Sequence, residues 1–432
     1  MKFGGRIQAS IEVLEDILGQ HTPAAYALRD WGKAHRFAGS KDRAAIGAIV
    51  FDALRRKTST LWRMDSETAR ALVLGTLVWQ WGENADSLTR AFSEDTHAPA
   101  PLSARERQLL AGAIDPAGAP DWIRADVPEW LWPAFENNFG EQALAEGEAL
   151  CARPPLDLRV NTLKTDRSRI LKGLGPKAKA CDLSPVGVRF AAGQKLERLP
   201  NIQSDPLYLT GQIEIQDEGS QIVSLLVDAK PGERVLDYCA GGGGKTLALA
   251  ADMKGEGALY AFDIDKRRLA PLYARAARAG AENIEVVQPP ARNLKTRVGS
   301  MDRVLVDAPC TGTGTWRRKP DVKWRLSLQT LETRLKEQRA VLRQAHVYVK
   351  PGGLLFYVTC SMLAEENEGQ VYAFLDEHPD FVLLSAGEVW EERIGVDKPR
   401  PWSEDGCTVL LSPASTNTDG LFLAVMRRET AL

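Results

Sequence analysis

Two cysteines and an aspartate stand at the ends of neighbouring segments that are predicted to be strands. Asp307 ends the apolar run of DRVLVDAP and Cys310 follows it, whereas Cys360 ends the run LLFYVTC. A single buried cysteine is usually a small apolar residue. Two cysteines at adjacent strand ends, one of them beside an Asp-Pro turn, instead indicate reactive thiols. A thiolate in such a place suits addition to an electron-poor ring.

The same cysteines do not indicate a metal site. Their spacing is wide, and the one histidine near them, His346, falls in a predicted helix. The five histidines of the chain form no triad pattern with the cysteines. We therefore expect no metal.

A glycine-rich loop, DYCAGGGGKT at residues 237–246, follows an earlier predicted strand. Its glycines let a ligand approach the backbone, and the N-terminus of the next helix favours anionic or polar groups. Gly244-Lys245-Thr246 matches the end of the motif of triphosphate-binding loops, but Cys239 stands where that motif requires its first glycine. This difference disfavours a phosphate-loop ATPase. A nucleotide-like cofactor site and a purely structural turn stay open.

An acidic residue, Asp263 in YAFDID, ends the next predicted strand. A carboxylate at this position can accept hydrogen bonds from both hydroxyls of a ribose. Alternatively, Asp263 or Asp265 caps the helix that follows. A glycine loop followed by such an acid is shared by nicotinamide-dependent enzymes and methyltransferases, so it does not choose between them.

From residue 233 onward, short apolar strands alternate with amphipathic helices. The predicted strands are ERVLDYCA, ALYAFDID, IEVVQ, DRVLVDAP and LLFYVTCS. This alternation predicts an α/β, Rossmann-like fold with a parallel sheet covered on both faces. Ligands of such sheets bind beyond the carboxyl ends of the strands. The glycine loop, Asp263, Asp307 with Cys310, and Cys360 are all predicted at that edge.

The residues before this sheet are predicted to form two further domains. Residues 1–125 show helical periodicity, for example in DRAAIGAIVFDALRR, and predict an all-helical accessory domain. Residues 126–230 mix helices and strands and predict a small α+β connecting domain. Residues 231–432 then form the Rossmann-like domain.

Composition fits an ordinary globular protein. The 432 residues are 44% hydrophobic and 26% charged, which excludes a disordered chain, a collagen-like chain and a small disulfide scaffold. Six sparse cysteines predict reduced thiols in a cytoplasmic protein. The first residues lack an apolar signal core, and no run of 18 apolar residues occurs, so we expect neither export nor a membrane span.

Two strongly basic stretches lie within this chain of net charge −2. Residues 151–180 hold eight Lys and Arg against two acids, and residues 311–350 hold ten against three. Such stretches indicate a face that binds a polyanion. A solvated helix surface is the alternative.

Several of these motifs together resemble the RsmB/Sun-type RNA (cytosine-5-)-methyltransferases, over nearly the whole chain. DYCAGGGGKT is similar to the cofactor loop of that family, AFDID to its ribose-binding acid, and TCS to its nucleophile motif. DAPCTGTG followed by RRKPDVKW is similar to the family signature. The N-terminal helices resemble the NusB-like domain of some members, which implies an accessory, RNA-binding role for residues 1–125.

The resemblance implies S-adenosyl-L-methionine as cofactor and a role for each matched residue. Cys360 would attack carbon-6 of a cytosine, Asp307 would hold the pyrimidine edge, and Cys310 would assist release of the product. Lys245 would lie near cofactor and base. The cofactor would be held by Cys239, Ala240, Gly241, Gly242, Gly243, Gly244, Lys245, Asp263 and Asp307.

The partner that the resemblance implies is a structured RNA, ribosomal RNA in the first place and tRNA as a second choice. The basic stretches would then hold phosphates, with Arg317, Arg318 and Lys319 as predicted contacts. The loop departs from the family by having Gly241 and Gly242 in place of Ala-Pro, and Pro290 replaces an acid that contacts adenine. A catalytically weak or inactive RNA-binding paralogue is therefore the alternative function.

Overall fold

In the computed structural model, residues 1–403 and 405–430 are described, and they form two compact units. Unit 1 combines residues Met1–Pro154 with two short segments from later in the chain, Ala192–Arg198 and Thr315–Leu326. Unit 2 comprises the rest of the described chain. The predicted division into three domains with boundaries at 125 and 230 stays a prediction.

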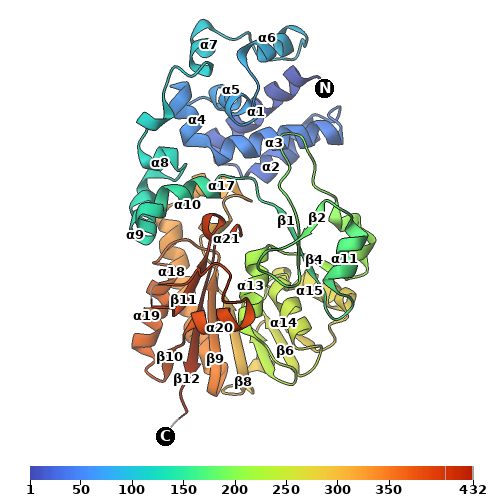
Figure 1. The fold of residues 1–432 in the computed structure, drawn as a ribbon, viewed down its shortest axis with the longest axis vertical. Coiled ribbons are helices and arrows are strands. Elements are labelled where there is room, and N and C mark those ends of the chain that lie inside the picture. The colour runs from blue at the N-terminus through green and yellow to red at the C-terminus, as the bar shows by residue number, and fades with distance from the viewer. Residues whose placement is uncertain (404, 431–432) are drawn as a thin grey trace. The chain divides into compact units, whose positions relative to one another are not determined.

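Unit 1 is built from helices, as predicted for the N-terminal part of the chain (Figure 1). Its helices are α1 (Phe3–Gln20), α2 (Ala24–Ala34), α3 (Ser40–Arg55), α4 (Lys57–Met64), α5 (Ala69–Trp79), α6 (Ala85–Ser93), α7 (Ala104–Leu110), α8 (Asp121–Arg124), α9 (Trp132–Phe139), α10 (Ala143–Leu150) and α17 (Pro320–Arg325). The apolar residues of α1, α3 and α5 recur at helical spacing, and they are buried together in one core. The apolar pattern of residues 128–150 predicts a single helix, but Gly140, at φ 50°, separates α9 from α10.

The late segment Thr315–Leu326 contributes buried side chains to unit 1. The Trp316 ring, 1% exposed, stacks on Phe135 with centroids 5.8 Å apart. Lys323 is 1% exposed and donates to the carbonyl oxygen of Arg55 at 3.1 Å. Arg317 is 2% exposed, and its carbonyl oxygen accepts from Arg55 Nε at 2.9 Å. The prediction that Arg317 contacts RNA phosphates is therefore wrong, because its side chain is buried.

Unit 2 contains a small antiparallel sheet in the order β2-β3-β1-β4. Its strands are β1 (Leu156–Val160), β2 (Ala178–Ala180), β3 (Gly187–Phe190) and β4 (Ile213–Ile215), with α11 (Arg167–Leu174) and α12 (Pro206–Leu209) beside them. In the basic stretch 151–180, Arg159 is buried within this sheet, so it is not available to a phosphate. The exposed cations of the stretch are Lys164, Arg169, Lys172, Lys177 and Lys179.

The large sheet of unit 2 has the order β10-β12-β9-β8-β5-β6-β7, and β11 pairs with β12. The strands are β5 (Arg234–Asp237), β6 (Ala258–Phe262), β7 (Ile284–Val287), β8 (Met301–Asp307), β9 (Val349–Thr359), β10 (Phe381–Leu383), β11 (Thr408–Leu411) and β12 (Leu421–Arg428). Strands β7, β6, β5, β8 and β9 are mutually parallel, as predicted, whereas β12 runs antiparallel to β9 (Figure 1). We predicted that β9 starts after Gly353, but it starts at Val349.

Helices cover both faces of this sheet, which confirms the predicted fold class. The remaining helices are α13 (Glu218–Val227), α14 (Gly244–Asp252), α15 (Lys266–Ala279), α16 (Arg292–Lys295), α18 (Leu328–Ala345), α19 (Glu368–Glu377), α20 (Ala386–Arg393) and α21 (Pro413–Thr416). Apolar residues of α13, α14, α15 and α20 share one core with alternate residues of the strands. Those of α18 and α19 share the other core with the intervening strand residues.

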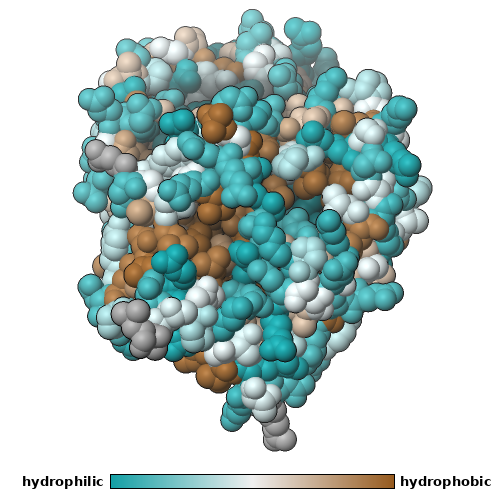
Figure 2. Space-filling view, turned by 60° about the horizontal axis from the view of Figure 1, so that its bottom comes forward, coloured by the Kyte–Doolittle hydropathy of each residue, from teal (hydrophilic) through white to brown (hydrophobic). Residues whose placement is uncertain are grey.

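Within the described residues, no helix is long and apolar enough to cross a membrane. On the face drawn in Figure 2, hydrophobic residues gather in a patch left of centre, within a surface that is otherwise mostly hydrophilic.

The buried position of Trp316 predicts that Trp316→Ala destabilises unit 1. Removing a buried indole costs about 3–5 kcal/mol of unfolding free energy, because a cavity is left beside Phe135. Urea unfolding followed by circular dichroism measures the loss. The matched control is Trp130→Ala, since Trp130 lies in the same unit but is 42% exposed. Equal effects of the two substitutions would contradict the burial of Trp316.

Candidate active site

The two predicted reactive cysteines lie in contact at the carboxyl-end edge of the large sheet. Cys310 follows β8 and Cys360 follows β9, and these strands are parallel neighbours. Their sulfur atoms are 3.3 Å apart, and both side chains are half-buried. The contact with Cys360, together with burial, raises the pKa of Cys310 well above its ordinary value. Cys310 therefore keeps its proton at neutral pH.

A buried carboxylate, Glu366, connects the loops that carry the two cysteines. Glu366 is 0% exposed and accepts hydrogen bonds from the backbone N–H of Thr311 at 2.8 Å and from Gln338 Nε2 at 2.9 Å. It also accepts from the hydroxyl groups of Thr311 and Ser361. Thr311 is next to Cys310 and Ser361 is next to Cys360, so one carboxylate fixes both loops.

Sequence reasoning missed Glu366. The segment AEENEGQ signals the start of a helix, and nothing in it distinguishes Glu366 from the acids beside it. Its role depends on Thr311 and Gln338, which are distant in sequence. The one available signal was its short distance from Cys360 along the chain.

Two glycines bring the cysteine loops close together. The N–H of Gly314 donates to the carbonyl oxygen of Cys360 at 3.0 Å, and the N–H of Gly420 donates to that of Gly314 at 2.8 Å. A Cβ atom at Gly314 would collide with the backbone of Gly420, and one at Gly420 would collide with Met362. Glycine at both positions therefore permits the approach of Cys310 to Cys360.

Lys245 and Asp307 form an ion pair at the same edge. The Nζ atom of Lys245, in the first turn of α14, lies 2.6 Å from Oδ2 of Asp307 at the end of β8. Burial opposes the charge of Lys245, but the adjacent carboxylate outweighs it, and the pKa of Lys245 is raised. Lys245 is therefore an ammonium group at neutral pH. The second oxygen of Asp307 has no hydrogen bond from this lysine, so it can accept one from a ligand.

Asp263 follows β6 and faces the glycine loop. Its carboxylate is 2% exposed. It accepts a hydrogen bond from the backbone N–H of Gly241 at 3.0 Å and another from the backbone N–H of Asp265 at 2.9 Å. Arg268 lies 3.6 Å away and is the nearest cation. A carboxylate offers about four acceptor positions, so Asp263 retains capacity for hydroxyl donors.

The loop between β5 and α14 needs glycine at two positions for different reasons. Gly241 and Gly243 have φ angles of 51° and 81°, which disfavour other residues. A Cβ at Gly243 would collide with Leu272 of α15. At Gly241 the nearest atom to such a Cβ is 3.7 Å away, so this glycine leaves space that a ligand can use.

Asp237, at the end of β5, is a further polar residue to which sequence reasoning gave no role. Its Oδ2 accepts from the Thr246 hydroxyl at 2.7 Å, whereas its buried Oδ1 has no partner within the described part of the chain. Burial raises the pKa of Asp237 to about 7. Burial, and after it the charge of Asp307, also raises the pKa of Cys239 well above its ordinary value. The loop thus offers acceptors and a neutral thiol to a cofactor with several donors.

The structure brings the predicted residues into two groups. Cys310, Cys360, Asp307 and Lys245 surround the ends of β8 and β9, and the loop Cys239–Gly244 with Asp263 surrounds the ends of β5 and β6. Pro290 lies beyond the end of β7 and is exposed. A proline side chain cannot accept a hydrogen bond there. The two thiols and the glycine loop therefore lie at one edge of the sheet.

The raised pKa of Asp237 predicts a pH-dependent stability. Well below pH 4 the carboxyl is protonated whether the chain is folded or not. As the pH rises from 4 to 7, the unfolded chain releases this proton and the folded chain keeps it, so wild-type stability falls by up to about 4 kcal/mol. Asp237→Asn lacks this loss and should be more stable than wild type above pH 7 but not at pH 4.

Urea unfolding at pH 4 to 8 measures this difference. Asp86→Asn, at an exposed position of α6, is the control and should follow the wild type. A constant difference between Asp237→Asn and wild type across this range would contradict the raised pKa.

Comparisons with known proteins agree with this arrangement. The family model described as 16S rRNA methyltransferase RsmB/F matches residues 224–427. A second model, described as an RsmF/B-like ferredoxin-like domain, matches residues 127–197. A solved methyltransferase homologue from Pyrococcus horikoshii is 30% identical, with a TM-score of 0.60, and the alignment covers 73% of this chain and 100% of that one.

Curated bacterial proteins are similar over comparable lengths. The probable ribosomal RNA small subunit methyltransferase B of Bacillus subtilis is 33% identical over 70% of this chain, and this alignment spans 66% of that protein, just under two thirds of its length. The ribosomal RNA small subunit methyltransferase B of Sodalis glossinidius is 32% identical over 73% of this chain and 70% of its own length. The chain therefore belongs to the RsmB/F family of rRNA methyltransferases, which its motifs resemble.

Proposed function

We propose that this protein transfers a methyl group from S-adenosyl-L-methionine to carbon-5 of a cytosine in ribosomal RNA of the small subunit. The observation that carries the proposal is the 3.3 Å contact between the thiols of Cys310 and Cys360 beside the Lys245–Asp307 ion pair. The substrate is supported by the names of the relatives, which are ribosomal RNA small subunit methyltransferases.

In this proposal the cofactor would bind at the glycine loop, beside Gly241, Asp263 and Asp237. Asp263 would hold the ribose hydroxyls, because its carboxylate is buried and retains acceptor capacity. The free Oδ1 of Asp237 offers a further acceptor close to the loop. When bound, S-adenosylmethionine supplies an electrophilic methyl group.

Cys360 activates the cytosine. Carbon-5 of cytosine is a poor nucleophile until the Cys360 thiolate forms a bond to carbon-6. The electron pair of the double bond between carbon-5 and carbon-6 then becomes available at carbon-5, which takes the methyl group. After methylation, carbon-5 loses its proton to solvent and the bond between sulfur and carbon-6 breaks. These two events restore the aromatic ring and the Cys360 thiolate.

The residues around Cys360 assist addition and release. Asp307 accepts a hydrogen bond from the pyrimidine edge and favours protonation of ring nitrogen 3, while Lys245 holds the other oxygen of this carboxylate. Cys310, which keeps its proton, donates its S–H toward Cys360 sulfur when the thiolate leaves. This donation stabilises the leaving group and speeds release of the product.

The cysteine roles predict opposite results for two substitutions. Cys360→Ala should abolish methyl transfer, because no thiolate remains to add to the ring. Cys310→Ala should allow addition but slow release, so a covalent protein–RNA species should accumulate on denaturing gels. The assay uses tritiated S-adenosylmethionine and small-subunit ribosomal RNA from a strain lacking the gene, and bisulfite sequencing locates the methylated cytosine.

The control for both variants is Cys407→Ala, since Cys407 is a half-buried cysteine of unit 2 away from this edge. It should retain activity without an adduct. Accumulation of the adduct by Cys360→Ala, with none in Cys310→Ala, would reverse the two roles. Normal activity of both variants would refute the covalent mechanism.

The cofactor pocket predicts that Asp263→Asn weakens binding of S-adenosylmethionine by roughly 10- to 100-fold. Losing hydrogen bonds from the ribose to a buried carboxylate costs about 1.5–3 kcal/mol. Isothermal titration calorimetry measures the affinity. Asp265→Asn is the control, because Asp265 lies two residues further on and asparagine can cap α15 as well. If the wild-type chain does not bind S-adenosylmethionine, the alternative function, an inactive RNA-binding paralogue, is favoured instead. The reason for considering this alternative is that Gly241-Gly242 and Pro290 replace residues of the family's cofactor site.

A further inference from the structure

Unit 1 contains a pocket of about 820 Å³ that the proposed chemistry does not use. It lies between the end of α3, α4, the end of α5 and α8, and the segment from Ala192 to Lys195 closes one side. Every lining residue belongs to unit 1. A pocket of this size is large enough to hold a small organic ligand.

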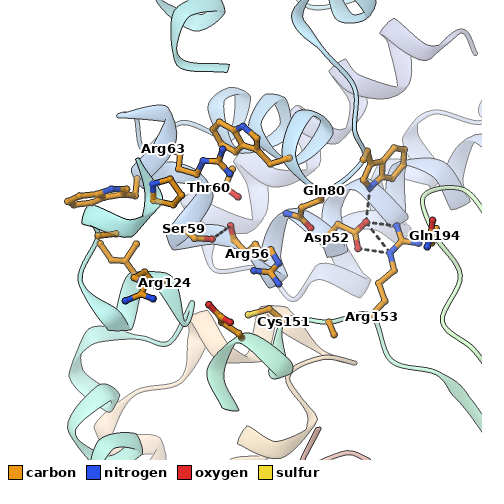
Figure 3. A pocket seen from close by; sticks show the side chains of 18 of the residues that line it. Asp52, Arg56, Ser59, Thr60, Arg63, Gln80, Arg124, Cys151, Arg153 and Gln194 are labelled. Atoms are coloured by element: carbon orange, nitrogen blue, oxygen red, sulfur yellow. Dashed lines mark hydrogen bonds and ion pairs between the residues drawn. The ribbon is translucent and has the colours of Figure 1, made fainter. Parts of the chain in front are cut away.

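The side chains around the pocket are predominantly cationic. Figure 3 labels four of them, Arg56, Arg63, Arg124 and Arg153, and the fifth is Lys195. The lining has two carboxylates, and one of them, Asp52, is 4% exposed and already bound by Arg55 and Arg153. The pocket therefore has an excess of positive charge that favours an anion.

One cation of the pocket has no acceptor in the described part of the chain. The guanidinium of Arg56, a half-buried residue, makes no hydrogen bond or ion pair with the residues described. Nε of Arg63 and Nε2 of Gln80 also lack hydrogen-bond partners, but the protein encloses both atoms, so a ligand cannot reach them. A hydrogen bond to a charged group contributes about 1.5–3 kcal/mol, so a ligand carrying oxygen acceptors would bind favourably at Arg56.

Aromatic rings complete the lining. Trp62 is 38% exposed, and the guanidinium of Arg63 stacks on the Trp79 ring at 3.6 Å from its centroid. Tryptophan faces and arginine planes are the surfaces on which unpaired bases stack, and the cations beside them hold the phosphates. An anion with a planar ring and several acceptors matches the positive charge, the unpaired donor and the aromatic rings of this pocket.

We propose that this pocket binds an unpaired nucleotide of the substrate RNA, with its base against Trp62 and its phosphate near Arg56. This inference rests on the proposed function, because it takes RNA as the substrate. It adds a binding site that lies outside the active-site edge. Arg124 is a weaker phosphate contact than Arg56, since it is already paired with Asp121.

The test is binding of a fluorescent single-stranded RNA 12-mer of mixed sequence to the full chain, followed by anisotropy. Trp62→Ala should weaken binding about tenfold, because stacking of one base contributes about 1–3 kcal/mol. The matched control is Trp130→Ala, since Trp130 is a tryptophan of the same unit with 42% exposure that lies outside the pocket. It should bind as the wild type does.

Arg56→Ala should lower the slope of log affinity against log salt by about 0.7, the value for one phosphate contact of a single strand. Arg36→Ala removes an exposed arginine of unit 1 outside the pocket and should leave the slope unchanged. RNA containing 4-thiouridine should also crosslink to the peptide that carries Trp62. This measurement needs no variant, so it holds even where a substitution disturbs folding.

The outcomes separate the possible ligands. Equal binding by each variant and its control, with no crosslink to the peptide, would overturn the proposal. Displacement of the RNA by free cytidine 5′-monophosphate at equal affinity would assign the pocket to free nucleotides and overturn it too. None of these measurements requires methyl transfer, so a failure of the proposed function would leave their results unchanged.

Discussion

The Glu366 carboxylate is the interaction on which the arrangement of the cysteines depends. It accepts hydrogen bonds from Thr311 and Ser361, the residues adjacent to Cys310 and Cys360. A buried carboxylate with this many donors is costly to disturb, because each donor would lose a partner that water cannot replace. Gln338 extends the network to α18 and also donates to the carbonyl oxygen of Pro309 at 3.0 Å. The distance between the thiols is therefore set by the fold rather than by the two loops alone.

Burial has a common effect on the titratable groups at this edge. It raises the pKa of Asp237, and it contributes to the raised pKa values of Cys239 and Cys310. At neutral pH the two thiols therefore stay protonated, whereas Asp237, with a pKa of about 7, is only partly ionised. Lys245 keeps its charge, because the adjacent Asp307 carboxylate compensates it. The edge thus places an ion pair next to groups that burial keeps wholly or partly neutral.

The sequence predicted the parallel sheet, the helical N-terminal part and the edge at which Asp263, Asp307 and Cys360 meet. These features depend on local patterns: apolar strand runs, helical periodicity and glycine loops. The burial of Arg317 and Lys323 could not be predicted, because a basic segment usually indicates a solvated surface. Their burial depends on partners far away in the chain, such as the carbonyl oxygen of Arg55. The role of Glu366 could not be predicted either, because it depends on Thr311 and Gln338, which are distant in sequence.

Unit 1 is assembled from three separate stretches of the chain, and the last of them is Thr315–Leu326. During synthesis, residues 155–326 must follow before this unit can close. At about 5–20 residues per second this takes roughly 10–30 seconds. Until then, the face of Phe135 that Trp316 later covers stays open as apolar surface on the nascent chain. The helices formed first are therefore expected to be clients of ribosome-associated chaperones, and a fragment that ends at residue 154 would retain this defect permanently.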